Sequence, residues 1–327
     1  MADIGELRYD QGISDGFAKH FVAGGFAESL VDYARGKYPI DFQYRKDPKH
    51  GTQWATLYGS LTAVLNVNGK GAKGLALDAH ATYRQRSLGW SEEWTAAAAV
   101  PTWTQRWDQV EASLERVIPK VVKDGRFITT EGILQAAVSG YLGGAARVIL
   151  DREVCPRFRD AETKRTIQDL YSDQLCKAIA NRQPAPGAPP KRYGMECDAL
   201  AIDAAGHLVA IEIKPGSAGT LAWAAAQATM YAKVLQHWVD KDPTWRSTIE
   251  KSFVQRRALG LVPPAFTLPG LKPAVVPAVA FQRVVAASYV ARMYDVQDAL
   301  LAEKVGDPAL TFYTVAPSGR LDHHQRP

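Results

Sequence analysis

The stretch ECDALAIDAAGHLVAIEIKPG, residues 196–216, decides the fold and the chemistry expected of this chain. Two apolar runs flank a short polar turn, a pattern typical of two strands joined as a hairpin. Side chains alternate between the two faces of a strand, so Glu212 and Lys214 share one face and the isoleucines beside them occupy the other. The first run carries one carboxylate near its start, Asp198.

The length of the turn determines which residues of the two strands face each other. A three-residue loop over 204–206, with its glycine in the left-handed conformation, is a common hairpin connection. This loop pairs Asp203 with His207. Counting outward, it also places Asp198 opposite Glu212, with Cβ atoms about 4.5–5.5 Å apart. A two-residue loop would place Asp198 opposite an isoleucine instead, and the acidic pair would be lost.

Two opposed carboxylates beside a lysine predict hydrolysis of phosphodiester bonds. Carboxylates at this spacing repel each other unless a cation lies between them, and Mg²⁺ binds through one or two carboxylates plus water and phosphate oxygens. Bound Mg²⁺ makes a hydroxide nucleophile available. We expect Asp198, Glu212 and the main-chain carbonyl of Ile213 to hold the metal, and Lys214 to assist the attacking water. A Glu-x-Lys pair alone is more often a solvated strand face, so the interpretation depends on Asp198.

The segment after the hairpin predicts a helix that begins at Thr220 and continues through residues 221–239. Gln227 and Tyr231 are four residues apart and therefore lie on one face of this helix. If that face points to the metal, both side chains suit contacts to nucleic acid. The alternative is that Tyr231 belongs to the core and Gln227 faces solvent.

These residues, taken in order, resemble a known family. The order is Asp198, thirteen intervening residues, Glu212-Ile213-Lys214 and then Gln227-x-x-x-Tyr231. It resembles the PD-(D/E)XK nuclease superfamily, and the Gln-x-x-x-Tyr helix resembles its RecB-like branch. A departure is Glu196-Cys197, since some members have proline just before the aspartate.

The resemblance implies an α/β fold with a restriction-endonuclease-like mixed β-sheet core flanked by helices. It implies a Mg²⁺-dependent deoxyribonuclease, with Mn²⁺ as a substitute metal, Asp198, Glu212 and Lys214 as catalytic residues, and Gln227 and Tyr231 as substrate-binding residues. The helix before the sheet sometimes supplies another acidic ligand in this superfamily. Glu162 and Glu131 are candidates for that role, but surface glutamates are far more often without one.

Composition places the chain among globular proteins, with 46% hydrophobic and 22% charged residues. A net charge of +5 fits DNA as partner. No apolar run approaches the roughly 18–20 residues that cross a membrane, so no membrane partner is expected. Cys155, Cys176 and Cys197 lack C-x-x-C spacing, which favours reduced thiols in a cytoplasmic setting. Three cysteines are too few for an iron–sulfur cluster of the chain's own.

The sequence predicts two domains, an accessory domain over residues 1–155 and the nuclease-like domain over 156–327. The first is mostly α with a β-hairpin, formed by the strand-like runs 54–67 and 75–83, and a helix over 131–150. It is expected to grip substrate, a protein partner or a second copy of the chain. At the hairpin tip, Lys70 and Lys73 are candidates for phosphate contacts, although solvated loop lysines are the ordinary case.

The second domain is predicted to contain a helix over 160–180, strands over 275–281 and 310–315, a helix over 286–304, and a disordered polar tail over 317–327. The alternative function is a non-catalytic module that uses the same fold to bind nucleic acid or protein in a larger assembly. DNA or RNA, ends or internal sites, and the recognition sequence are left open by these residues.

Overall fold

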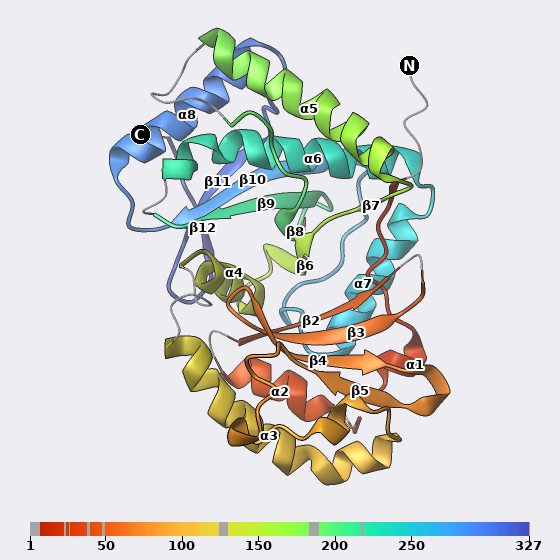
Figure 1. Cartoon of the computed structure of the whole chain (residues 1–327). Coiled ribbons are helices and arrows are strands. Elements are labelled where there is room, and N and C mark those ends of the chain that lie inside the picture. Colours follow the sequence, from red (N-terminus) through yellow and green to blue (C-terminus); the bar gives the residue numbers. More distant parts are fainter. Residues whose placement is uncertain are drawn as a thin grey trace. The chain divides into compact units, whose positions relative to one another are not determined.

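The computed structural model describes residues 7–22, 24–25, 27–37, 40–47, 50–123, 130–182, 190–216 and 219–326. The chain is mixed α/β and forms two compact units, each built from separate stretches of sequence (Figure 1). The six-stranded unit comprises Met1–Tyr9, Tyr141–Ile249 and Pro263–Pro327, and the four-stranded unit comprises Asp10–Gly140 and Glu250–Val262.

A mixed sheet with the strand order β12-β11-β10-β9-β8-β6 forms the centre of the six-stranded unit. Strands β9, β10 and β11 run parallel, whereas β6, β8 and β9 form an antiparallel meander and β12 returns antiparallel to β11. The predicted strands over 275–281 and 310–315 are confirmed as β10 and β11. The strands are β6 (Arg147–Val154), β8 (Cys197–Asp203), β9 (Leu208–Lys214), β10 (Val275–Gln282), β11 (Thr311–Val315) and β12 (Leu321–His323).

Helix α6 packs on β9 and β10 and lies beneath α5 and α8, which both contact it (Figure 1). Its first turns are rich in alanine, and these small side chains are completely buried. Small residues allow close approach on both sides of a helix, which suits one enclosed between a sheet and other helices. The helices are α5 (Ala161–Arg182), the 3₁₀ turn η4 (Gly219–Trp223), α6 (Ala224–Lys241), the first part of α7 (Trp245–Ala258) and α8 (Ala287–Ala302). Residues 250–258 of α7 belong to the four-stranded unit.

Strand β1 (Leu7–Arg8) adds a short pairing to the six-stranded unit, because it runs antiparallel to β7 (Arg157–Phe158). The hydroxyl of Tyr9 then donates to Oδ2 of Asp151, and its ring packs edge-on against Trp238. Chain segments far apart in sequence therefore stabilise the outer part of this sheet.

The four-stranded unit is built on an antiparallel sheet in the order β2-β3-β4-β5. One face of this sheet carries the apolar core, in which Phe42, Leu57 and Val67 pack with Trp103 and Val110 of α3. The strands are β2 (Ile40–Lys46), β3 (Gln53–Gly59), β4 (Thr62–Gly69) and β5 (Leu75–Asp78). The helices are α1 (Asp15–Ala18), α2 (Glu28–Gly36), α3 (Val100–Lys123) and α4 (Thr130–Gly140), with 3₁₀ turns η1 (Gly71–Lys73), η2 (Arg86–Leu88) and η3 (Glu92–Thr95).

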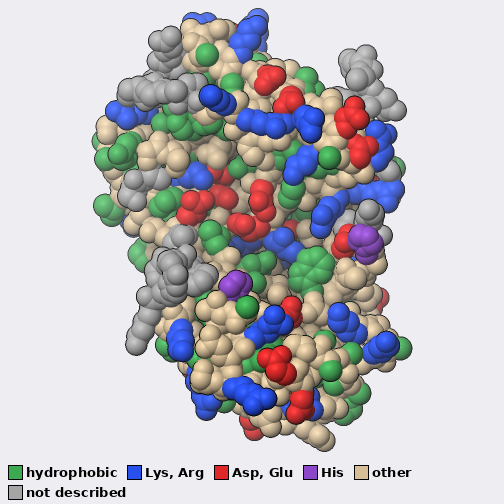
Figure 2. All heavy atoms as spheres, in the orientation of Figure 1, with side chains coloured by type: hydrophobic (Ala, Val, Ile, Leu, Met, Phe, Trp, Pro, Cys, Tyr) green, Lys and Arg blue, Asp and Glu red, His purple; other side chains and the backbone are tan. Residues whose placement is uncertain are grey.

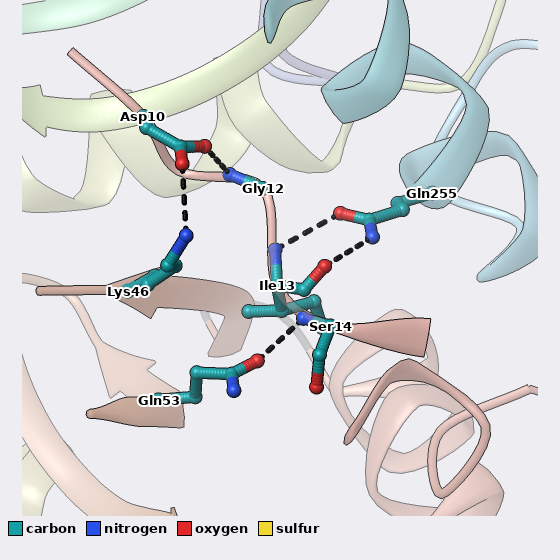
Figure 3. A network of polar contacts seen from close by, with 7 residues as sticks. All are labelled: Asp10, Gly12, Ile13, Ser14, Lys46, Gln53 and Gln255. Atoms are coloured by element: carbon teal, nitrogen blue, oxygen red, sulfur yellow. Dashed lines mark hydrogen bonds and ion pairs between the residues drawn. The ribbon is translucent and has the colours of Figure 1, made fainter. Parts of the chain in front are cut away.

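Residues 10–14 enter the four-stranded unit as an extended segment held by polar side chains (Figure 3). Asp10 forms an ion pair with Lys46 at 3.0 Å. The Gln255 side chain bonds both main-chain groups of Ile13, since its Oε1 accepts from N–H at 3.1 Å and its Nε2 donates to the carbonyl at 2.6 Å. Gln255 thus satisfies the buried backbone as a neighbouring strand would.

The helix predicted over 131–150 is wrong beyond its first part. Helix α4 ends at Gly140, and residues 147–154 form β6, which pairs with β8. Gly143 and Gly144 interrupt the helix, and the β-branched run that follows suits a strand. The run 54–67 is likewise two strands, β3 and β4, which reverse at Ser60 with φ 60°. The predicted pairing across the Lys70–Lys73 tip is confirmed by β4 and β5.

The expectation of a disordered tail is also wrong. Residues 321–323 form β12, and the main-chain N–H of His324 donates to the carbonyl of Phe312 at 2.8 Å. The ring of His324 lies edge-on to Phe281, with 5.1 Å between the ring centroids, and Arg326 forms an ion pair with Asp298. A polar segment orders here because its aromatic and charged side chains find partners on the sheet and on α8.

The division of the chain differs from a single boundary at residue 155. Residues 141–155 belong with the six-stranded unit, and residues 250–262 belong with the four-stranded unit. Within the described ranges, none of the helices combines the length and the apolar character needed to cross a bilayer.

Candidate functional site

The β8–β9 hairpin has the predicted register. The main-chain N–H of Asp203 donates to the carbonyl of His207, and the three-residue loop between them has Gly206 at φ 91°. Ala199 pairs with Ile211, and one further step along the two strands places Asp198 opposite Glu212. Oδ1 of the Asp203 side chain accepts from the main-chain N–H groups of Ala205 and His207, which fixes the turn.

Asp198, Glu212 and Lys214 lie together inside the protein. Their side chains are buried, with exposed fractions of 9%, 0% and 7% for the residues in that order. Lys214 Nζ lies 2.5 Å from Glu212 Oε1, so these residues share a strand face as predicted. The main-chain N–H of Ile213 donates to Asp198 Oδ2 at 2.6 Å, which holds the aspartate against β9.

The balance of charge in this cluster favours a cation. Two carboxylates face one ammonium group among these three side chains. Removing carboxylates from water costs free energy unless opposite charge or hydrogen bonds compensate them. A divalent ion between Asp198 and Glu212 would place positive charge beside both carboxylates.

Tyr231 and Gln227 of α6 lie beside the carboxylates. Tyr231 is 5% exposed, whereas Gln227 is half-buried. Burial raises the pKa of Tyr231, the charges of Glu212 and Asp198 raise it further, and a hydrogen bond with Gln227 opposes the shift. The phenol is therefore protonated at neutral pH and serves as a hydrogen-bonding group rather than as a base. The prediction that these residues share a helix face near the acidic pair is confirmed; their contact with substrate stays a prediction.

Two residues that the sequence pattern does not mark also lie next to Asp198 in the chain or in the sheet register. Cys197 is buried, and its thiol donates to the carbonyls of Ala199 and Ile211. Burial raises the pKa of Cys197, as do the charges of Asp198 and Glu212. The thiol therefore stays protonated and packs in the core, and it is not a metal-binding thiolate.

Glu153 of β6 is the second of these residues. Arg152 pairs with Ala199 and Val154 with Cys197, so the register carries Glu153 across from Asp198. Glu153 has φ 51°, a conformation that non-glycine residues rarely adopt in a strand. The run Arg147–Leu150, with its adjacent Val and Ile, is the sequence signal for β6.

The other two candidate acidic ligands belong to helices. Glu162 is exposed in the first turn of α5, and Glu131 belongs to α4 in the four-stranded unit. In the parts of the chain that the structure describes, no three His, Cys, Asp or Glu side chains group so as to hold a metal ion. The expected metal site has two carboxylates and a main-chain oxygen, which is a donor set that Mg²⁺ accepts when water completes its shell.

The cluster can bind a hard divalent ion, and Lys214 can orient or neutralise an anionic group beside that ion. Comparisons of the chain with protein-family models, with curated proteins and with solved structures found no match.

Proposed function

We propose that this chain is a metal-dependent nuclease that hydrolyses phosphodiester bonds of DNA. The observation that carries the proposal is the buried pair of opposed carboxylates, Asp198 and Glu212, with Lys214 in contact with Glu212. Like charges directly opposed across two strands are destabilising. The presence of both carboxylates inside the protein is explained if they hold a cation during part of the catalytic cycle.

The order of elements around the site supports the same proposal. The antiparallel strands β8 and β9 carry the aspartate and the Glu-x-Lys pair, α6 carries Gln227 and Tyr231, and β10 returns parallel to β9. This is the arrangement that the resemblance to the PD-(D/E)XK superfamily implies, with metal ligands on adjacent strands of a mixed sheet. A cytoplasmic setting and Mn²⁺ as a substitute metal belong to the proposal as well.

Each residue has a defined part in this chemistry. Asp198, Glu212 and the carbonyl of Ile213 would hold Mg²⁺, which when bound supplies a water of lowered pKa and positive charge at the phosphate. Lys214 orients the attacking water and stabilises negative charge on the phosphate oxygens. Because Lys214 contacts Glu212 in the structure, its ammonium group must exchange a carboxylate for water or phosphate as substrate enters. Tyr231 and Gln227 bind the substrate and position it next to the acidic pair.

The test is DNA cleavage by the full chain with Mg²⁺ and with EDTA. Lys214→Ala should lower the rate by about 10²-fold or more, the usual effect of losing a group that stabilises transition-state charge. Asp198→Asn should abolish the response to Mg²⁺. Lys272→Ala changes an exposed lysine of the same unit and should leave the rate unchanged. Cleavage that survives both Lys214→Ala and EDTA would exclude this mechanism.

A non-catalytic binding module is the second candidate. The observation that favours it is the Lys214–Glu212 ion pair, which already compensates one buried carboxylate without a metal. Calorimetric titration with Mg²⁺ and Mn²⁺ separates the two functions. Metal uptake that disappears in Asp198→Asn supports the nuclease, whereas a protein that binds DNA but takes up neither metal is a binding module.

A further inference from the structure

The four-stranded sheet has one face that the apolar core does not use. Tyr44, Ala55, Val67 and Leu77 form one row across the strands, and all four belong to the core. Successive residues of a strand point to opposite faces, so the neighbouring rows lie on the other side. Gln43 and Thr56 on that side are buried, and Gln43 is bonded to Ser139 of α4 and to Arg256 of α7. We call the accessible part of this side the outer face and define it by Arg45, Trp54, Asn66 and Asn68.

The outer face combines an aromatic ring with a cation and two amides. Arg45, Trp54 and Asn68 form one row, and the register places them side by side on β2, β3 and β4. All three are half-buried, so part of each side chain reaches solvent. In the next row, Thr56 donates its hydroxyl to Oδ1 of Asn66 at 2.6 Å. That bond fixes the Asn66 amide before any ligand arrives, which lowers the entropy cost of binding.

The loop at this end of the sheet adds positive charge. Strand β4 runs from Asn68 into the tip, where Lys70 and Lys73 are exposed. Among the described residues, neither lysine forms an ion pair. Lys46, at the same end of the sheet, is engaged by Asp10 (Figure 3). Asp78, which pairs with Asn66 in the sheet, forms an ion pair with Arg84 at 3.3 Å.

We propose that the outer face and its lysine tip form a docking surface for single-stranded nucleic acid. A base stacks on the indole of Trp54, phosphates contact Lys70 and Lys73, and the amides of Asn66 and Asn68 accept or donate to base edges. The choice of ligand rests on the proposed nuclease function.

The chemistry favours a single strand over a duplex or a protein. Bases in a duplex are stacked on each other, so an indole on a sheet face meets a base only if the strand is open. A protein interface would call for a contiguous apolar core, and the outer face instead offers amides and positive charge around one ring. Figure 2 shows basic side chains mixed with acidic ones on the visible face, so overall charge alone does not select this surface.

Binding is separated from hydrolysis by measuring it in the Asp198→Asn background with EDTA. The readout is the fluorescence anisotropy of labelled oligo(dT) and of the matching duplex at several salt concentrations. Trp54→Leu, which keeps apolar volume without an aromatic face, should weaken oligo(dT) binding at least about fivefold. Trp54→Phe should retain most of the affinity. Thermal unfolding followed by circular dichroism checks that both variants are folded.

The lysines are tested through the salt dependence of binding. Each phosphate contact to a single strand contributes about 0.7 to the slope of log K against log salt, so the double variant Lys70→Ala/Lys73→Ala should reduce that slope by about 1.4. Lys120→Ala, an exposed lysine on α3, is the matched control and should bind as the parent does.

Three outcomes overturn the docking surface: no binding of oligo(dT), equal loss of binding in Trp54→Leu and Trp54→Phe, or a Trp54-independent preference for the duplex. The two proposals fail separately. If the wild-type chain cleaves DNA but its binding of oligo(dT) does not depend on Trp54, only the docking surface is excluded. If binding depends on Trp54 but the chain does not cleave DNA with Mg²⁺, only the nuclease function is excluded.

Discussion

At the scale of single residues, the contact between Lys214 and Glu212 is both a stability feature and a site feature. Both side chains are nearly inaccessible to solvent, and Nζ lies 2.5 Å from Oε1. A buried ion pair often contributes little net stability compared with apolar residues of the same size, but removal of one partner leaves an uncompensated charge. The asymmetry makes the pair open to a direct test.

Lys214→Met should destabilise the metal-free protein by roughly 3–5 kcal/mol, the usual cost of an unpaired buried charge. Adding Glu212→Gln should recover much of that loss, because the remaining amide carries no charge. Urea unfolding of the full chain in EDTA measures both variants, with the exposed Lys272→Met as control. If Lys214→Met unfolds at the parental urea concentration, the ion pair does not compensate Glu212.

At the scale of elements, the β8–β9 turn sets the site, because its length determines whether Asp198 meets Glu212. Gly206 has φ 91°, and a Cβ atom there would lie 2.2 Å from the carbonyl oxygen of Gly270. Alanine is disfavoured by the backbone conformation and by that close approach.

Gly206→Ala should therefore cost roughly 1–3 kcal/mol of unfolding free energy, and it should lower cleavage by displacing Asp198 from Glu212. Gly36→Ala is the matched control, since Gly36 has open space around it and no positive φ. Urea unfolding and the cleavage assay give the two readouts. Unchanged values in both would mean that the turn tolerates a side chain and does not control the register.

The hairpin was predictable because its information is local. The turn, the alternation and the acidic pair all lie within residues 196–216, and α6 follows directly. Strand β6 was missed because its partner, β8, lies far along the chain and its own residues follow a helix. Glu153 was missed with it. Strand β12 was missed for a similar reason, since a polar segment gives no sign of the aromatic rings that it meets in the fold.

At the scale of the whole molecule, both units are assembled from discontinuous stretches. Local composition marked a boundary near residue 155, but a strand before it belongs to the six-stranded unit, and residues 250–262 belong to the four-stranded unit. Pattern within a segment does not reveal which core that segment joins, because that depends on partners distant in sequence.

A fragment of residues 156–327 should accordingly fail to fold cooperatively. It lacks β6 and Tyr9, so β8 loses its antiparallel partner next to the acidic pair. A fragment of residues 141–327 keeps β6 and should show more strand signal and a sharper thermal transition by circular dichroism. A cooperative transition in the shorter fragment, matching that of the longer one, would contradict this account.

The outer strands of the six-stranded sheet also bear on self-association. One edge strand, β12, is only three residues long (Leu321–His323). The other edge strand, β6, is bent by an irregularity between Ile149 and Asp151 and by the left-handed backbone at Glu153. A short edge strand and a bulged edge strand both pair poorly with a strand of another molecule. Neither of these two strands therefore offers a long, flat row of unpaired backbone groups on which a fibril-like stack could grow.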